Sequence, residues 1–233
     1  MSVTRLPAIL LFGLACATAR PAAAVSVVLT ELTGLTGGSP AATAVFKADL
    51  STIGIASVLS ISIADNSAGL GGAPGQFSGF DLDAIKLSTT DCADAACAAA
   101  AAGLAVFDFT AGTIFAPGTQ RLPADPKLFG TGPAGNTVDV VVATLGLFDG
   151  DSTTAIPGAD GFMSLGDDGV LSFNLTAATS TTGLLLYIGE VGDNGELAAS
   201  SIEVRQTTVP EPGSIALLAA ALAGVALVRR RRA

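Results

Sequence analysis

The chain has 233 residues, half of them apolar, so a hydrophobic core can form and wholesale disorder is excluded. It contains no His, which excludes Ser-His-Asp and Cys-His hydrolases as well as metal and haem sites built on imidazole. A formal net charge of −9 argues against a nucleic acid partner, because phosphate contacts require Lys and Arg.

Residues 1–24 have the pattern of a Sec-type secretory signal peptide. Arg5 supplies the positive start, and residues 6–17 form an apolar run well short of the roughly 20 residues that a membrane span needs. The small residues at 22–24 predict cleavage after Ala24. Two alternatives remain: a transmembrane anchor, and a lipoprotein signal that would use Cys16.

Residues 25–208 read as a single body made mostly of short β-strands. Alternating or continuous apolar runs are separated by Gly, Pro, Asn, Asp and Ser, as is typical of strands joined by tight turns. This pattern predicts an all-β fold, a β-sandwich or jelly-roll-like domain. The expected strands are 25–32, 44–50, 53–63, 80–87, 104–109, 138–148, 171–176, 184–188 and 202–204.

An Ala-rich stretch at 95–102 is the one helix that the body predicts, because Ala is the strongest helix former. It lies beside Cys92 and Cys97, an even pair in a chain that carries an export signal, which favours a disulfide-closed loop. A metal or redox pair is the alternative, although redox pairs usually have the spacing C-x-x-C and zinc sites need four ligands.

Asp residues cluster on Gly-containing loops late in the body. Calcium prefers carboxylate and carbonyl oxygens, so these loops are a candidate calcium site. No stretch has the spacing of an EF-hand, and Asp-Gly is also a common turn dipeptide, so plain turns are the competing interpretation. The candidate ligands are Asp149, Asp151, Asp160, Asp167 and Asp168.

The residues give little support for catalysis. Paired carboxylates are the machinery of glycosidases, but a chain with so many acids places some pairs together by chance. The absence of Trp and the presence of a single Tyr also leave few aromatic platforms for a sugar ring. We therefore expect no enzymatic activity and, apart from calcium, no cofactor.

The C-terminal end has three parts in a fixed order. Pro210-Glu211-Pro212 comes first, an apolar run at 215–228 follows, and Arg229, Arg230, Arg231 and Arg232 close the segment. As a helix the run would be about 21 Å long, against roughly 30 Å of hydrocarbon. Charges of the Arg cluster remain on the cytoplasmic side, so the body is expected on the other side of the membrane.

This end, residues 209–233, resembles the PEP-CTERM sorting signal of Gram-negative bacteria, on the Pro-Glu-Pro sequence, the apolar helix and the terminal Arg cluster. The resemblance implies processing by exosortase, a membrane-embedded cysteine protease-transpeptidase, with cleavage near Pro210, Glu211 and Pro212. It also implies a transient inner-membrane anchor, followed by transfer to the cell surface or the exopolysaccharide matrix. The alternative is a plain tail anchor that keeps the protein in the periplasm.

Removal of both ends leaves 19 acidic and 5 basic residues in the body, a net charge near −14. Such a body is expected to be soluble and to repel polyanions. The first hypothesis is a structural or interaction protein of the cell surface or biofilm matrix. A calcium-dependent carbohydrate-binding module that holds the protein in exopolysaccharide is the second hypothesis, and a secreted hydrolase is the third. A tail-anchored periplasmic protein is a further alternative.

Overall fold

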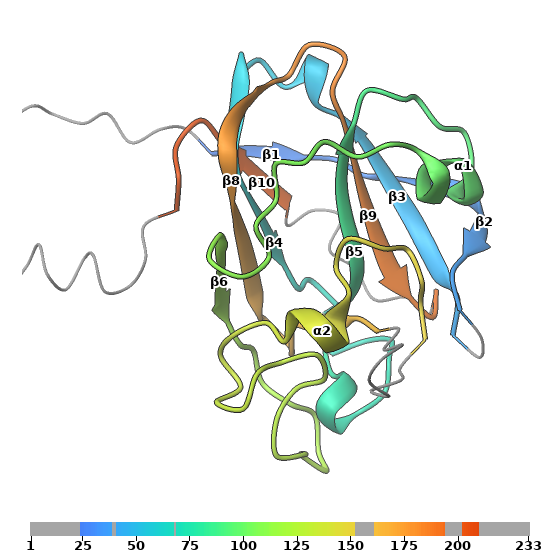
Figure 1. The fold of residues 1–233 in the computed structure, drawn as a ribbon. Helices are drawn as coiled ribbons and strands as arrows, with labels where there is room; N and C mark the ends of the chain where they lie inside the picture. The colour runs from blue at the N-terminus through green and yellow to red at the C-terminus, as the bar shows by residue number, and fades with distance from the viewer. Residues whose placement is uncertain (1–23, 39–40, 68, 152–160, 194–201, 210–233) are drawn as a thin grey trace, which may run out of the picture.

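The computed structural model describes residues 24–38, 41–67, 69–151, 161–193 and 202–209. Within these residues, ten strands form two five-stranded sheets in which every neighbouring pair of strands is antiparallel (Figure 1). The first sheet has the order β1 (Val25–Val27), β10 (Ile202–Arg205), β4 (Ser57–Ala64), β8 (Val170–Ser180) and β6 (Thr113–Ala116). The second has the order β2 (Thr30–Thr36), β3 (Thr43–Asp49), β9 (Leu185–Val191), β5 (Asp81–Ser88) and β7 (Met163–Ser164).

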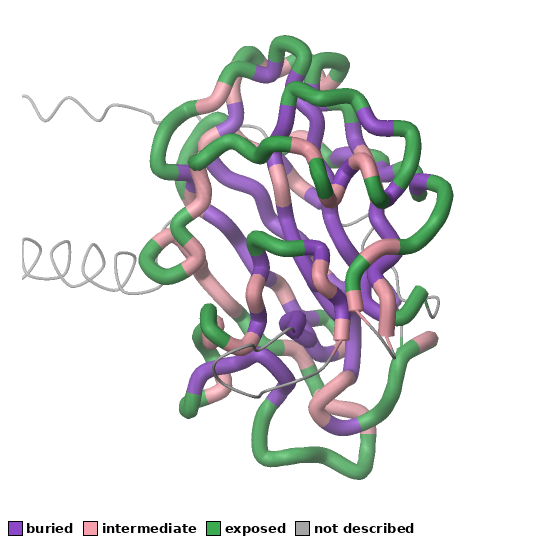
Figure 2. Tube along the Cα trace, turned by 45° about the vertical axis from the view of Figure 1, so that its right-hand side comes forward, coloured by how far each residue is buried: buried purple, intermediate pink, exposed green. Residues whose placement is uncertain are grey.

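The main core lies between the two sheets and is built from alternate residues of each strand. Successive side chains of a strand point to opposite faces, so one row across the first sheet is apolar and the next is polar. The apolar row is Val25, Val204, Ile61 and Phe173. The adjacent polar row on the outer face is Ser26, Glu203, Ser62 and Ser172. Figure 2 shows burial concentrated along the strands and exposure in the loops.

A second, smaller core covers the outer face of the second sheet. The helix α1 (Ala95–Ala100) packs there with Ala95 and Ala98 against Val45, Ala84 and Tyr187. This sheet is therefore buried on both faces, and for that reason every residue of β9 is buried. A strand that is apolar on both sides carries no alternating signal in the sequence.

The expected all-β sandwich is confirmed, and so is the short helix at 95–102, which spans Ala95–Ala100. The expected strand at 25–32 is in fact two strands, because the chain crosses from one sheet to the other between β1 and β2. The expected strand at 53–63 begins only at Ser57, after the 3₁₀ turn Leu50–Thr52. The short strands β6 and β7 were not anticipated.

The long strand expected at 138–148 is wrong. Asp139 accepts hydrogen bonds from the backbone N–H groups of Val141 and Val142 at 3.3 Å each and starts the single helical turn α2 (Val140–Ala143). Thr144, in the left-handed conformation with φ 46°, ends the turn. A capping Asp and tertiary contacts thus outweigh the strand preference of the Val run.

The strand expected at 104–109 is also wrong. This segment makes only an isolated bridge between Phe107 and Leu175, and its two rings, Phe107 and Phe109, both pack on Phe173. Phe107 and Phe109 therefore pack on the core, and the segment forms no continuous strand pairing.

Two other expectations concern the ends of the chain. The signal peptide expected at 1–24 falls almost entirely outside the described residues, and the helix expected at 215–228 falls wholly outside them. Among the described residues, no helix combines the length and the apolar character required to cross a membrane.

Candidate functional site

The chain that leaves β10 turns back over the outer face of the first sheet before it reaches the C-terminal motif. The Val209 N–H donates to Asn174 Oδ1 at 2.7 Å, and Asn174 Nδ2 donates to the Val209 carbonyl at 3.0 Å. The Ser60 hydroxyl donates to the Thr207 carbonyl at 2.7 Å. This orange-red segment lies at the left of Figure 1. Thr207 and Val209 are thus fixed to the body through three hydrogen bonds.

Sheet register explains why these two side chains meet the tail. Arg205 of β10 is opposite Ser60 of β4, and Ser60 is opposite Asn174 of β8. All three positions belong to the polar outer face, because their neighbours Val204, Ile61 and Phe173 point into the core. A chain that turns after Arg205 therefore crosses Ser60 first and Asn174 next.

The N-terminal end of the described chain lies on the same sheet. Val25 is paired with Val204, and β1 lies at the edge of the sheet directly beside β10. The predicted signal cleavage after Ala24 would therefore leave a new N-terminus beside the strand that leads to the tail.

A shallow groove of about 400 Å³ runs over this outer face beside the tail attachment. Arg205 is paired with Glu203 at 2.5 Å, and the hydroxyls of Ser62 and Ser172 are 2.8 Å apart. The lining residues are Ser26, Ser62, Ala64, Val170, Ser172, Glu203 and Arg205. The lining offers hydrogen bonds but no aromatic ring for stacking.

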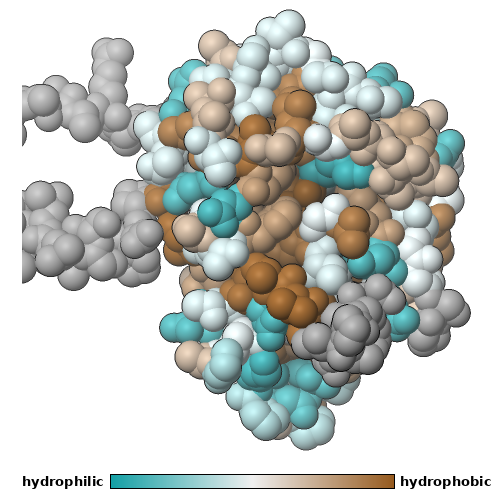
Figure 3. All heavy atoms as spheres, viewed as in Figure 1, coloured by the Kyte–Doolittle hydropathy of each residue, from teal (hydrophilic) through white to brown (hydrophobic). Residues whose placement is uncertain are grey.

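A second groove, of about 350 Å³, lies between the loop 101–109 and Gly146 and has two aromatic rings in its lining. Phe107 and Phe109 stand stacked on its wall, with ring centroids 5.5 Å apart and planes inclined by 5°. Figure 3 shows apolar surface along the middle of this side of the molecule, extending over α2, where Val140 and Val141 are exposed.

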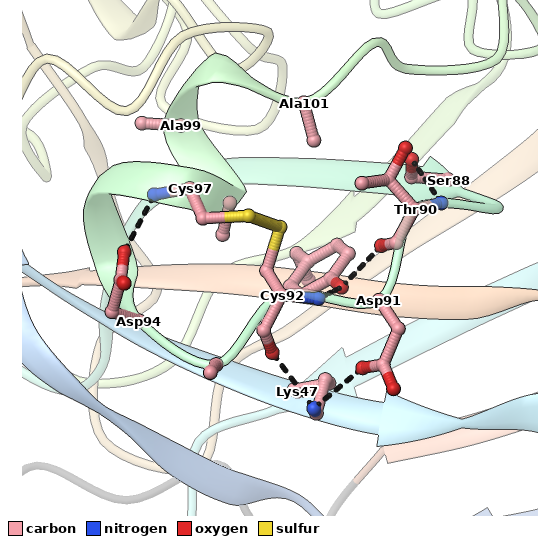
Figure 4. The surroundings of a disulfide bond; sticks show 12 residues. Lys47, Ser88, Thr90, Asp91, Cys92, Asp94, Cys97, Ala99 and Ala101 are labelled. Carbon is pink, nitrogen blue, oxygen red and sulfur yellow. Dashed lines mark hydrogen bonds and ion pairs between the residues drawn. A yellow bond between two sulfur atoms is a disulfide. The ribbon is translucent and has the colours of Figure 1, made fainter.

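Cys92 and Cys97 form the expected disulfide, and the loop that they close is braced from three sides (Figure 4). Asp94 caps α1 by accepting from the Cys97 N–H at 2.8 Å. The Tyr187 hydroxyl donates to the Thr90 carbonyl and accepts from the Cys92 N–H. Lys47 donates to the Cys92 carbonyl and pairs with Asp91, both at 2.8 Å.

Lys86 closes the other end of α1. Its ammonium donates to the carbonyls of Ala98 and Ala99 at 2.8 Å and lies 4.9 Å from the centre of the Phe148 ring. Burial lowers the pKa of Lys86, although the carbonyl ends of a helix favour a cation. These contacts make the disulfide-closed loop a rigid cap on the sheet and leave no open site at the cysteines.

The candidate calcium ligands occupy two loops with different contacts. Asp149 accepts from the Thr144 hydroxyl at 3.1 Å, and the Asp151 N–H donates to the Ala41 carbonyl. Asp167 is paired with Arg121 at 3.4 Å, and Asp168 donates its N–H to a buried carboxylate oxygen of Asp65. Asp160 lies outside the described residues. Within the part of the chain that the structure describes, no three His, Cys, Asp or Glu residues lie close enough together to hold a metal ion.

Sequence reasoning missed the buried carboxyl of Asp83. It is fully buried on β5, 2.5 Å from the Thr43 hydroxyl and 3.0 Å from the Gly150 N–H, which donates to it. Burial raises the pKa of Asp83 to about 7, and the neighbouring Asp149 acts in the same direction, while the Thr43 hydrogen bond opposes the shift. The carboxyl thus links β5 to Thr43 of β3 and to the loop at Gly150.

The structure therefore defines an all-β sandwich whose last described residues, Thr208 and Val209, lead directly into the C-terminal segment. Residues 208–232 match the family model described as the PEP-CTERM protein-sorting motif. The chain thus carries the motif that the sequence resemblance implied, and the motif marks it as an exported protein directed to an exosortase-type processing enzyme. No curated protein and no solved structure matches the chain significantly.

The motif residues themselves, Pro210, Glu211 and Pro212, and the cluster Arg229 to Arg232 lie outside the described residues. The matched segment begins two residues earlier, so its first two residues, Thr208 and Val209, belong to the described chain. Asn174 and Ser60 hold this stretch, and no local sequence signal identifies them, because the contacts join residues 35 and 147 positions apart.

Proposed function

We propose that the body, residues 25–208, is a non-enzymatic structural or interaction component that an exosortase-type enzyme delivers to the cell surface or the exopolysaccharide matrix. The match of residues 208–232 to a sorting motif carries this proposal. In it, Pro210, Glu211 and Pro212 are the processed segment, the apolar run is the transient inner-membrane anchor, and the Arg cluster holds that anchor in orientation.

The character of the body supports this assignment. A rigid sandwich with a disulfide and a strongly acidic surface remains folded and soluble outside the cell. The described part of the chain offers no His and no group of carboxylates that could hold a metal ion. Its buried Asp83 is hydrogen-bonded to Thr43 of β3. A structural or binding role fits these features better than a catalytic one.

The test is the intact mass of the protein from membranes and from culture supernatant of cells that produce it. A released species that starts at Val25 and ends between Pro210 and Gly213 supports both cleavages, and any added mass at its new C-terminus identifies the attachment. A membrane species that retains Arg229 to Arg232, with none released, would instead establish the tail-anchored periplasmic alternative.

The carbohydrate-binding alternative has one observation in its favour, the stacked rings of Phe107 and Phe109 at the wall of the second groove. Its calcium component depends on Asp149, Asp151, Asp160, Asp167 and Asp168. Millimolar calcium that raises the melting temperature, together with calcium-dependent sedimentation of the body with purified exopolysaccharide, would support it. An unchanged melting temperature would remove the calcium component.

A further inference from the structure

The side chain of Asn174 engages Val209 as a neighbouring strand would. It accepts from the Val209 N–H at 2.7 Å and donates to the Val209 carbonyl at 3.0 Å, so both polar groups of that residue are occupied. A carboxamide is suited to this role because it carries an acceptor and a donor side by side. Asp at this position would lose the donor, and Ala would lose both groups.

Ser60 gives the tail a second fixed point two residues earlier. Its hydroxyl donates to the Thr207 carbonyl at 2.7 Å, and Ser60 itself is directly opposite Asn174 on the neighbouring strand. Ser60 and Asn174 lie on inner strands of the first sheet, β4 and β8, and each of these strands is paired on both sides. The tail is therefore attached to a rigid part of the body, and residues 207–209 do not act as a flexible linker.

The next residue, Pro210, begins the sorting motif. Proline restricts the residue before it to extended conformations, which agrees with the hold on Val209. Only residues 210–214 separate Val209 from the apolar run that starts at 215. Fully extended, five residues span at most about 17 Å. In the proposed anchored form, the start of the apolar run can therefore lie no farther than this from the fixed point at Val209.

We infer that Asn174 is a positioning residue for sorting: it fixes the chain at Val209, directly before the motif, and so limits where the processing enzyme meets Pro210, Glu211 and Pro212. This inference rests on the proposed function. A segment that is ordered before it binds loses less conformational entropy on binding, so the fixed tail lowers the cost of recognition. Processing then depends on a folded body and not on the motif alone.

The experiment compares the wild-type full chain with Asn174→Ala, Asn174→Asp and Ser60→Ala in cells that contain the sorting enzyme. Pulse-chase labelling gives the half-time of conversion from the anchored to the processed form. Asn174→Ala removes two hydrogen bonds and is expected to slow conversion at least about fivefold, the equivalent of one net hydrogen bond. Asn174→Asp is expected to do the same, because its second oxygen faces the Val209 carbonyl and cannot donate to it.

The matched control is Asn136→Ala. Asn136 is exposed, and its side chain makes no hydrogen bond within the described residues, so this variant is expected to be processed at the wild-type rate. Urea unfolding of the processed body distinguishes loss of positioning from loss of folding, because Asn174 lies on the outer face and its loss is expected to leave the core intact. Ser60→Ala removes a hold without touching Asn174, so it tests the inference even if the Asn174 variants fold poorly.

The possible outcomes distinguish the proposed function from the positioning role of Asn174. A wild-type chain that is never processed contradicts the proposed function itself. A wild-type chain that is processed, with folded Asn174 and Ser60 variants converted equally fast or faster, overturns the positioning role alone. Slower conversion of these variants with unchanged unfolding of the body supports it.

Discussion

The hydroxyl of Tyr187 and the backbone N–H of Cys92 are 3.0 Å apart, and this hydrogen bond joins the centre of the second sheet to the disulfide-closed loop. The same hydroxyl donates to the Thr90 carbonyl at 2.7 Å. Tyr187 and Cys92 are both fully buried, so water cannot readily replace the bond between them when the hydroxyl is removed.

Tyr187→Phe is therefore expected to lower the free energy of unfolding by about 1–3 kcal/mol, because it leaves the buried Cys92 N–H unpaired. Urea unfolding measures this loss. Thr33→Val is the control, since the Thr33 hydroxyl makes only an exposed, 3.3 Å bond to the Ala93 carbonyl. Equal stability of wild type and Tyr187→Phe would contradict the bracing role of the hydroxyl.

Replacement of both cysteines, Cys92→Ala with Cys97→Ala, is expected to cost about 2 kcal/mol, the loop-closure estimate for so short a ring. The effects of this change and of Tyr187→Phe are not expected to add, because both act on the same loop. A double-mutant cycle by urea unfolding measures the coupling. Strict additivity would show that the loop remains ordered without its disulfide.

Asp83 makes stability depend on pH with a definite sign. Its pKa is raised from 3.8 to about 7 in the folded state, so the folded protein holds a proton that the unfolded chain releases. The contribution to stability is full below about pH 4, falls as the pH rises and is lost above about pH 7. Thermal unfolding of wild type from pH 4 to pH 8 is expected to show this fall.

Asp83→Asn tests the assignment, because the amide imitates the protonated carboxyl in shape and charge. Its oxygen accepts from Gly150, and its nitrogen donates to the Thr43 hydroxyl, which can rotate. The variant is expected to be less sensitive to pH over this interval. The difference between the two curves isolates Asp83 from the general repulsion among acids, and parallel curves would show that the carboxyl titrates normally.

Gly79 occupies a position where any side chain collides with another segment. It has φ +74°, and a Cβ built on it would lie 2.3 Å from the carbonyl carbon of Gly166. Gly79→Ala is expected to destabilise the protein by about 3 kcal/mol or more, because backbone strain and a clash with main chain add.

Gly183 separates these two causes. It has φ +61° and would have no atom within 4 Å of an added Cβ, so Gly183→Ala adds backbone strain alone, about 1 kcal/mol. The two variants are compared by urea unfolding. Losses of equal size would mean that the Gly166 segment moves aside and that the close approach is unimportant.

The sequence predicted the parts of the fold that are encoded locally. Alternation at 58–63 identified β4, and the Ala run beside the cysteines identified α1 and the loop. It failed at 138–148, where the strand preference of three consecutive Val residues is overridden by the capping Asp139. No local pattern distinguishes such a turn from a buried strand.

The functional segment divides in the same way. The sequence alone identifies the sorting motif, because Pro210, Glu211 and Pro212 are contiguous and the order of the three parts of the segment is diagnostic. The roles of Asn174 and Asp83 cannot be predicted from the sequence, because they depend on which strands lie side by side. Asn174 reads as an ordinary polar position of β8 until the register places it beneath Val209.

The pairing of β1 with β10 has a consequence for the order of assembly. Among the strands that the structure describes, β1 pairs with β10 alone, and β10 lies between β1 and β4. A chain that emerges from an export channel N-terminus first cannot complete the first sheet until Ile202–Arg205 has also emerged, and such distant pairings form slowly. Completion of the first sheet therefore waits for the same C-terminal end that carries the sorting motif.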